Sequence, residues 1–199
     1  MKTILEGIKE RRSIYVLDDE KVLNEDVLEK IVKVVTKCVP SPFNMQSQRV
    51  VLLTEKHHKK LWSIVLETLR KTVPTEKFEA TEAKINKSFG AGYATILYFE
   101  DQAIVEKMGN QFPKYKENFE TWSEHGNAML QYALWTALEA EGLGASLQHY
   151  NPLIDDEVKE TWNLPEQWKL IAQMPLGKAI APAEEKTFIP IDEKVKVFK

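Results

Sequence analysis

The 199-residue sequence has one cysteine, Cys38, which excludes an intrachain disulfide and a cysteine-based metal centre. Its longest apolar run, at 94–99, is far shorter than the roughly 20 residues that cross a bilayer. The first residues also lack the apolar core of a signal peptide. We therefore expect a cytoplasmic protein, kept in a reducing compartment, with no membrane partner.

An excess of basic residues is missing as well. The chain has 27 lysine and arginine residues against 30 aspartate and glutamate residues, a net charge of -3, and no lysine- or arginine-rich tract. Proteins that bind nucleic acids usually carry a basic patch that matches the phosphate backbone. We expect no nucleic-acid partner.

Several catalytic motifs are absent. The segment "GLGASL" (142–147) has a leucine where a dinucleotide fingerprint requires its third glycine, and it follows an expected helix instead of a strand. No Walker A, HExxH or GxSxG motif occurs, and the four histidines do not have the spacing of metal ligands. We expect neither a Rossmann domain nor a metal site.

The pattern of apolar residues predicts one α+β domain over 1–199, because helices and strands alternate too irregularly for a βαβ series. The expected helices are 2–12, 25–39 with Asn24 as N-cap, 56–71, 75–88, 124–141 and 155–162. The expected strands are 49–54, 93–101, 144–150 and 169–177, with an edge-strand pattern at 193–199. The pattern weakens at 102–122, which we interpret as a mobile element or lid.

The same pattern suggests which side chains are buried. Cys38 lies on an apolar helix and is expected to be buried, whereas His57 and His58 are expected at the surface. The segment 124–141 is apolar on nearly all sides, so it should lie in the core or between subunits.

Polar residues at the ends of these elements could bind a ligand. Arg11, Arg12 and Ser13 offer two guanidinium forks and a hydroxyl, which suit a phosphate. Asn44 and Gln46 each offer an amide donor and acceptor, as needed to read the edge of a heterocycle. From residue types alone, a solvated helix end is the commoner role of paired arginines, and the amides could equally satisfy backbone groups in a proline turn.

Four segments together resemble the nitroreductase superfamily of flavin mononucleotide (FMN) enzymes, especially its short fatty-acid-repression-type branch, which includes copper-induced nitroreductases. "RRSIY" is similar to the phosphate motif of that family, and "VPSPFNMQSQRVVLL" to its P-S-x-x-N-x-Q segment and following strand. "GLGASLQHYNP" resembles the strand that passes the flavin ring, and "MPLGKAIAPAEEKTFIPIDEKVKVF" resembles the closing strand and C-terminal arm.

The resemblance implies an intertwined homodimer with a central mixed or antiparallel sheet flanked by helices, an interface helix at 124–141 and C-terminal arms at about 178–199. It also implies FMN as the cofactor, with cofactor-binding residues Arg11, Arg12, Ser13, Pro42, Asn44, Gln46, Gln148, His149 and Lys186. On residue types alone, His149 is as readily a structural strand histidine. Four aromatic residues, which could be either core or a lid over the flavin, are the candidate substrate contacts: Phe112, Tyr115, Phe119 and Trp122.

The activity that the resemblance implies is NAD(P)H-dependent reduction of flat electrophiles, nitroaromatics or quinones, by ping-pong hydride transfer through flavin N5. No catalytic side chain is expected, since FMN carries the chemistry. Two departures leave an alternative open, a flavin-binding sensor or regulatory dimer with little turnover. Tyr15 stands where many relatives have a basic residue, and Thr187 and Phe188 follow Lys186 where many have a second basic residue. A structural dimer without a cofactor is a third possibility.

Overall fold

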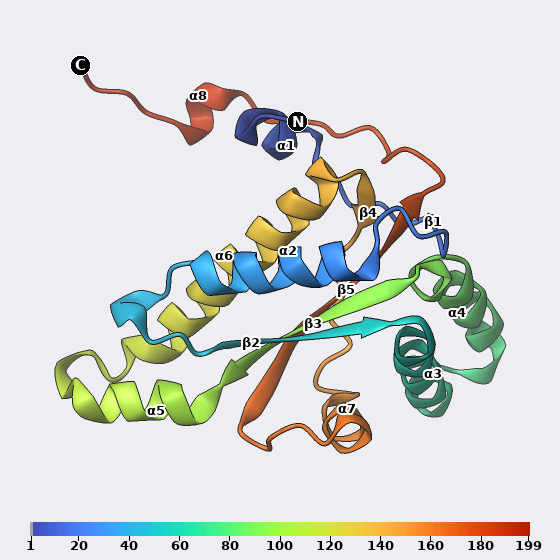
Figure 1. The fold of residues 1–199 in the computed structure, drawn as a ribbon, viewed down its shortest axis with the longest axis horizontal. Coiled ribbons are helices and arrows are strands. Elements are labelled where there is room, and N and C mark those ends of the chain that lie inside the picture. The colour runs from blue at the N-terminus through green and yellow to red at the C-terminus, as the bar shows by residue number, and fades with distance from the viewer. Residues whose placement is uncertain (1) are drawn as a thin grey trace.

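The computed structural model describes residues 2–199 and contains one antiparallel sheet between layers of helices (Figure 1). The strand order is β1-β5-β3-β2, and β4 also pairs with β5. The strands are β1 (Leu17–Asp18), β2 (Gln48–Thr54), β3 (Ala94–Asp101), β4 (Leu143–Ala145) and β5 (Trp168–Ala179). The predicted α+β class with an antiparallel sheet is therefore confirmed.

The helices of the described chain are α1 (Ile4–Glu10), α2 (Glu25–Cys38), α3 (Glu55–Thr72), α4 (Thr75–Lys87), α5 (Gln102–Gln111), α6 (Asn118–Ala140), α7 (Asp155–Trp162) and α8 (Ile191–Lys194). Short 3-10 turns occur at η1 (Pro42–Asn44), η2 (Phe89–Ala91) and η3 (Pro113–Tyr115). Within residues 2–199 no helix is both long and apolar enough to cross a membrane.

Alternation along β3 divides the core into two layers. Ile96 and Tyr98 pack with α2 and α6 on one face, whereas Leu97 and Phe99 pack with α3 and α7 on the other. Successive side chains of a strand point to opposite faces, so a strand buried on both sides reads as a continuous apolar run. The run "ATILYF" is that strand, and all eight residues of β3 are buried.

Helix ends follow the capping residues in the sequence. Asn24 caps α2 by accepting a hydrogen bond from the backbone N–H of Asp26, as predicted. Thr3 and Glu6 form a capping box at the start of α1. Gly142 has a φ of 84° just after α6, which is the left-handed conformation expected of a helix C-terminus.

The segment 102–122 is more regular than its sequence pattern suggests. It forms α5, η3 and the first residues of α6, which begins at 118 instead of the predicted 124. Pro113 lies between the two helices, at the first position of η3, where a backbone N–H would have no hydrogen-bond partner within the turn. The weak periodicity reflects a two-helix corner instead of an irregular loop.

The strand predicted at 144–150 is wrong beyond Ala145. Ser146 donates its N–H to the carbonyl of Pro175 at 3.3 Å, but Pro175 has no N–H to return the bond. The ladder therefore stops, and pairing resumes only as an isolated bridge between Gln148 and Gln173 in the same register.

Three other expectations are wrong. The predicted edge strand at 193–199 is absent, because the described tail forms α8 and then extends without any strand beside it. Cys38 is exposed, since it is the last residue of α2 and faces away from the buried Leu28 and Val32. His58 is fully buried, because it shares the core-facing side of α3 with Leu61 and Trp62.

Candidate functional site

The four predicted phosphate-binding residues, Arg11, Arg12, Ser13 and Lys186, line one cavity of about 670 Å³. We call it the arginine cavity. One wall is the segment after α1, and the other is the chain that leaves β5 toward α8. The complete lining is Arg11, Arg12, Ser13, Tyr15, Val16, Ala181, Pro182, Ala183, Glu184, Glu185, Lys186 and Thr187.

The segment that carries the arginines is fixed to the sheet. Ser13 forms a parallel bridge with Ala145, and the N–H of Ile14 donates to the carbonyl of Ala145 at 2.9 Å. The guanidinium of Arg12 donates to the backbone carbonyl of Glu184, which joins the two walls of the cavity. Strand β4 and the C-terminal segment thus position the motif.

Arg11 is held by aromatic rings of α6 instead of by a carboxylate. Its guanidinium carbon lies 4.3 Å from the ring centroid of Trp135 and 5.8 Å from that of Tyr132. Its Nε is buried and has no hydrogen-bond partner among the described residues. A buried donor without a partner is costly, and an anionic ligand would satisfy it.

The donor set of the arginine cavity fits a phosphate group. The side chains of two arginines, a serine and Lys186 line the cavity, and charge-assisted bonds from guanidinium and ammonium groups are strong. Glu184 and Glu185 bring negative charge to the same lining, but both residues are exposed, so solvent and salt screen them.

The predicted amide residues line a second cavity, of about 410 Å³, which we call the amide cavity. It lies between α2, β2 and the turn that contains η1. Its lining is Val32, Lys33, Thr36, Lys37, Val39, Asn44, Gln46, Gln48, Arg49, Val50 and Trp168. Pro42 is the first residue of η1.

The turn of the amide cavity is conformationally strained. Phe43, Asn44 and Gln46 have φ values of 53°, 51° and 51°, a left-handed region that residues other than glycine seldom adopt. Such strain persists only where the surroundings fix the backbone, and it is concentrated at functional sites.

Arg49, which the sequence interpretation missed, fixes this turn. Its guanidinium donates to the carbonyls of Gln46 and Gln48 at 2.8 and 2.9 Å and to the carboxylate of Asp101 at 3.0 Å. The hydroxyl of Ser41 also accepts from the backbone N–H of Gln46 at 2.9 Å. An arginine next to a P-S-x-x-N-x-Q segment was the available signal.

A buried polar network lies beneath the turn. Asn127 of α6 donates to the carboxyl of Glu100 at 2.9 Å and to the carbonyl of Phe99 at 3.1 Å, and it accepts from Gln131 at 2.7 Å. Burial raises the pKa of Glu100, which favours a neutral carboxyl in the interior. The network connects α6 to β3, the strand that pairs with β2.

The four predicted substrate contacts form one aromatic cluster around a residue that was not predicted, Phe43. Its ring centroid lies 4.9 Å from Phe112, 5.8 Å from Tyr115, 5.4 Å from Phe119 and 6.0 Å from Trp122. Phe43 is half exposed, whereas Phe119 is buried. The cluster joins the turn of the amide cavity to α5 and α6.

The two cavities lie at opposite ends of α6. Arg11 contacts Trp135 near the C-terminal end of the helix, whereas Phe43 contacts Trp122 near its N-terminal end. At about 1.5 Å per residue, these tryptophans are about 20 Å apart along the axis. One copy of the chain therefore does not bring the arginine and amide motifs together.

The remaining predicted contacts lie elsewhere. Gln148 is half-buried, and its side chain donates to the hydroxyl of Ser146 at 3.1 Å. His149 is exposed. Neither lines the arginine cavity or the amide cavity.

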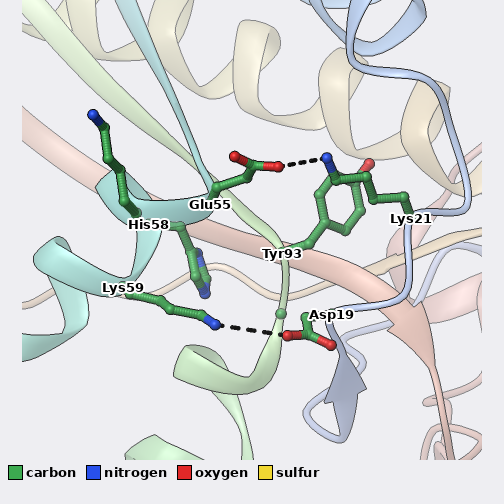
Figure 2. A pocket seen from close by; sticks show the side chains of 8 residues that line it. Asp19, Lys21, Glu55, His58, Lys59 and Tyr93 are labelled. Carbon is green, nitrogen blue, oxygen red and sulfur yellow. Dashed lines mark hydrogen bonds and ion pairs between the residues drawn. The ribbon is translucent and has the colours of Figure 1, made fainter.

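A third cavity, of about 370 Å³, contains none of the predicted site residues (Figure 2). Four of its charged side chains form two ion pairs, Lys21 with Glu55 at 2.6 Å and Lys59 with Asp19 at 3.8 Å. Burial lowers the pKa of His58 to about 4 and raises that of Tyr93 to about 12. Neither group is poised to exchange protons near neutral pH.

The fold is α+β, and its arginine and amide cavities have the size of small-molecule sites. A model of the nitroreductase family matches residues 8–178. HBN1 of Saccharomyces cerevisiae is 33% identical over 196 residues, which cover 97% of this chain and 96% of that protein. The chain belongs to the nitroreductase family and is an oxidoreductase of the flavin nitroreductase type.

Solved structures agree with this assignment. Nitroreductase CinD from Lactococcus lactis, solved in complex with nicotinic acid, is 41% identical and has a TM-score of 0.92, covering 99% of this chain and 100% of its own. CinD has also been solved with chloramphenicol and with 4-nitrophenol. A protein from Exiguobacterium sibiricum in complex with FMN shares the fold at 14% identity and a TM-score of 0.72, covering 100% of this chain and 98% of its own.

Proposed function

We propose that this protein is an FMN-dependent NAD(P)H oxidoreductase that reduces nitroaromatics or quinones in a ping-pong reaction. The arginine cavity carries the proposal, because it gathers cations and a buried donor without a partner where a phosphate would satisfy them. The FMN complex of the Exiguobacterium sibiricum protein supports the choice of cofactor.

Each chain would form a single FMN-binding domain over 1–199. Arg11, Arg12, Ser13 and Lys186 would bind the FMN phosphate. Pro42, Asn44 and Gln46 would read the edge of the ring, with Gln148 and His149 along its other side.

The working unit would be a homodimer. Because the arginine and amide motifs lie at opposite ends of α6, the amide motif of one copy would complete the arginine cavity of its partner. Apolar side chains that one copy leaves exposed support this arrangement. Met129 and Tyr132 of α6 are each 43% exposed, and Phe188 and Phe198 of the tail are 80% and 94% exposed.

Bound FMN would supply the redox chemistry, accepting a hydride from NAD(P)H at N5 and passing the electrons to the acceptor. In a two-electron cycle, NAD(P)H and a proton yield NAD(P)⁺, while a nitro group becomes a nitroso group and releases water. The protein would contribute binding and orientation. The aromatic cluster, Phe43 with Phe112, Tyr115, Phe119 and Trp122, would pack against flat acceptors. The 4-nitrophenol and chloramphenicol complexes of CinD support acceptors of this kind.

An anaerobic titration tests the proposal. The purified protein should be yellow, NADH or NADPH should bleach its flavin absorbance, and a nitroaromatic or a quinone should restore it. A yellow protein that NAD(P)H does not bleach would instead support a flavin-binding sensor. A colourless protein that binds no added FMN would overturn both.

A further inference from the structure

The amide cavity carries a concentration of positive charge that is opposite in sign to the whole chain. Lys33, Lys37 and Arg49 line it, and none of its lining residues is a carboxylate. The chain has a net charge of -3, so this local excess of cations does not follow from composition. We infer that this cavity selects acceptors with an anionic substituent on a flat ring, which deepens the proposed function and depends on it.

The three cationic side chains are not equally free to bind an anionic ligand. Arg49 is bound to Asp101 and to two backbone carbonyls, so it is part of the framework. Lys33 pairs with Glu29 one turn earlier on the exposed surface of α2. Lys37 has no carboxylate within ion-pair distance in the part of the chain described, 2–199. Lys37 is therefore the principal anion contact, and Lys33 the second.

The geometry of α2 places Lys33 and Lys37 on the same face of the helix. Residues four apart on a helix are neighbours with about 6 Å between their Cβ atoms, so both ammonium groups can reach the same anionic substituent. Their side chains are long and flexible, and a bound carboxylate would be at the edge of the cavity, not in its interior.

The rest of the lining suits an aromatic ring. Val39, Val50 and Trp168 provide an apolar surface, and Asn44 and Gln46, which would read the edge of the flavin ring, would bring that surface next to the cofactor. A cavity of about 410 Å³ is within the range that takes a small ligand of one or two rings. A ring on the apolar surface with its carboxylate toward Lys37 uses both features, so the favoured class is the aromatic acids.

A matched pair of acceptors tests this inference. For the FMN-loaded protein, kcat/KM for 4-nitrobenzoate is compared with that for the neutral 4-nitrobenzamide. The wild type should favour the acid, and Lys33→Gln/Lys37→Gln should lower the acid-to-amide ratio about fivefold, mainly through KM, as expected for solvent-exposed charges. High salt should lower the wild-type ratio in the same direction.

Lys84→Gln is the matched control, because Lys84 is exposed on α4. This helix lies at the opposite end of the sheet from the start of β2, where the amide cavity is (Figure 1). It makes the same chemical change and should leave the ratio unaltered. An unchanged ratio in the double variant, or an equal fall in the control, would overturn the inference while the reductase activity stands.

Binding gives a readout that does not require turnover. Calorimetric titration of the FMN-loaded protein with benzoate and with benzamide should show tighter binding of benzoate, and the double variant should lose that difference. Equal affinity for the two compounds in the wild type would refute the anion preference. Failure of both nitro compounds and of a quinone to reoxidise a reduced protein would instead refute the proposed function.

Discussion

Arg11 has an environment that explains why an arginine pair can occur at a helix end without a carboxylate partner. The rings of Trp135 and Tyr132 contact its guanidinium, and its buried Nε has no partner within residues 2–199. Aromatic faces stabilise a cation without using its N–H donors. The donors therefore remain available to a ligand phosphate.

Arg11→Ala should weaken FMN binding by on the order of 2 kcal/mol, since it removes charge-assisted hydrogen bonds to the phosphate. Flavin fluorescence quenching during titration measures the Kd. Arg70→Ala is the control, because Arg70 also lies over a ring, that of Phe78 at 4.6 Å, but belongs to α3. An unchanged flavin Kd in Arg11→Ala would contradict the phosphate assignment.

His58 is a buried neutral histidine in a chain of hydrogen bonds. The indole of Trp62 donates to the hydroxyl of Thr95 at 3.1 Å, and His58 Nδ1 lies 2.8 Å from the same hydroxyl. Its Nε2 lies 3.3 Å from the carbonyl of Gly90. This arrangement assigns the proton to Nε2 and leaves Nδ1 as an acceptor.

The lowered pKa of His58 predicts how stability depends on pH. Its folded pKa is about 4 against an ordinary value of 6.5, so the unfolded chain binds more protons between these values. The stabilisation is complete above pH 6.5 and is lost as the pH falls toward 4, by roughly 2–3 kcal/mol at pH 4.5. Urea unfolding at several pH values measures this slope.

The comparison of two histidines isolates the effect from that of the carboxylates. His58→Gln should reduce the loss of stability between pH 6.5 and 4.5, whereas His125→Gln, at an exposed position, should not. The same pH slope in both variants would show that His58 does not titrate as described.

At the scale of elements, the aromatic cluster connects η1 to α5 and α6 through Phe43, whose backbone is left-handed. Phe43→Ala removes the ring but keeps the strained φ, and should cost about 1–2 kcal/mol, less than a fully buried phenylalanine. Phe43→Gly removes the same ring and relieves the strain, so it should be about 1 kcal/mol more stable than the alanine variant. Urea unfolding measures both, and equal stability of the two variants would exclude backbone strain at this turn.

Elements with a strong local signal were predictable from sequence. Asn24 and the apolar periodicity located α2, and the unbroken run at 94–99 located β3, because capping and burial depend on neighbouring residues. The arginine and amide motifs were also recognisable, and the structure places each of them on a cavity.

The errors came from contacts between distant segments. The strand at 144–150 ends early because of a proline on another strand, Pro175, and His58 is buried because α3 turns that face toward β3. Phe43 and Arg49 were missed because their roles depend on partners such as Trp122 and Asp101, which are far away in sequence. Local patterns do not contain this information.

At the scale of the whole molecule, α6 separates the two motifs that the proposed site requires. Its N-terminal end contacts the turn of the amide cavity, and its C-terminal end contacts Arg11. The exposed apolar residues of α1, Ile4, Leu5 and Ile8, lie beside the same C-terminal end of α6. A second copy would cover apolar surface and join the two motifs at once.

Mixing two defective variants tests this central claim directly. Arg11→Ala/Arg12→Ala removes one motif, and Asn44→Gly/Gln46→Gly removes the other without straining the left-handed backbone. If each site takes one motif from each copy, a mixed dimer has one intact and one doubly defective site. Equal mixing after unfolding and refolding should then restore wild-type FMN affinity to about one quarter of the sites. No recovery of tight FMN binding in the refolded mixture would contradict the account.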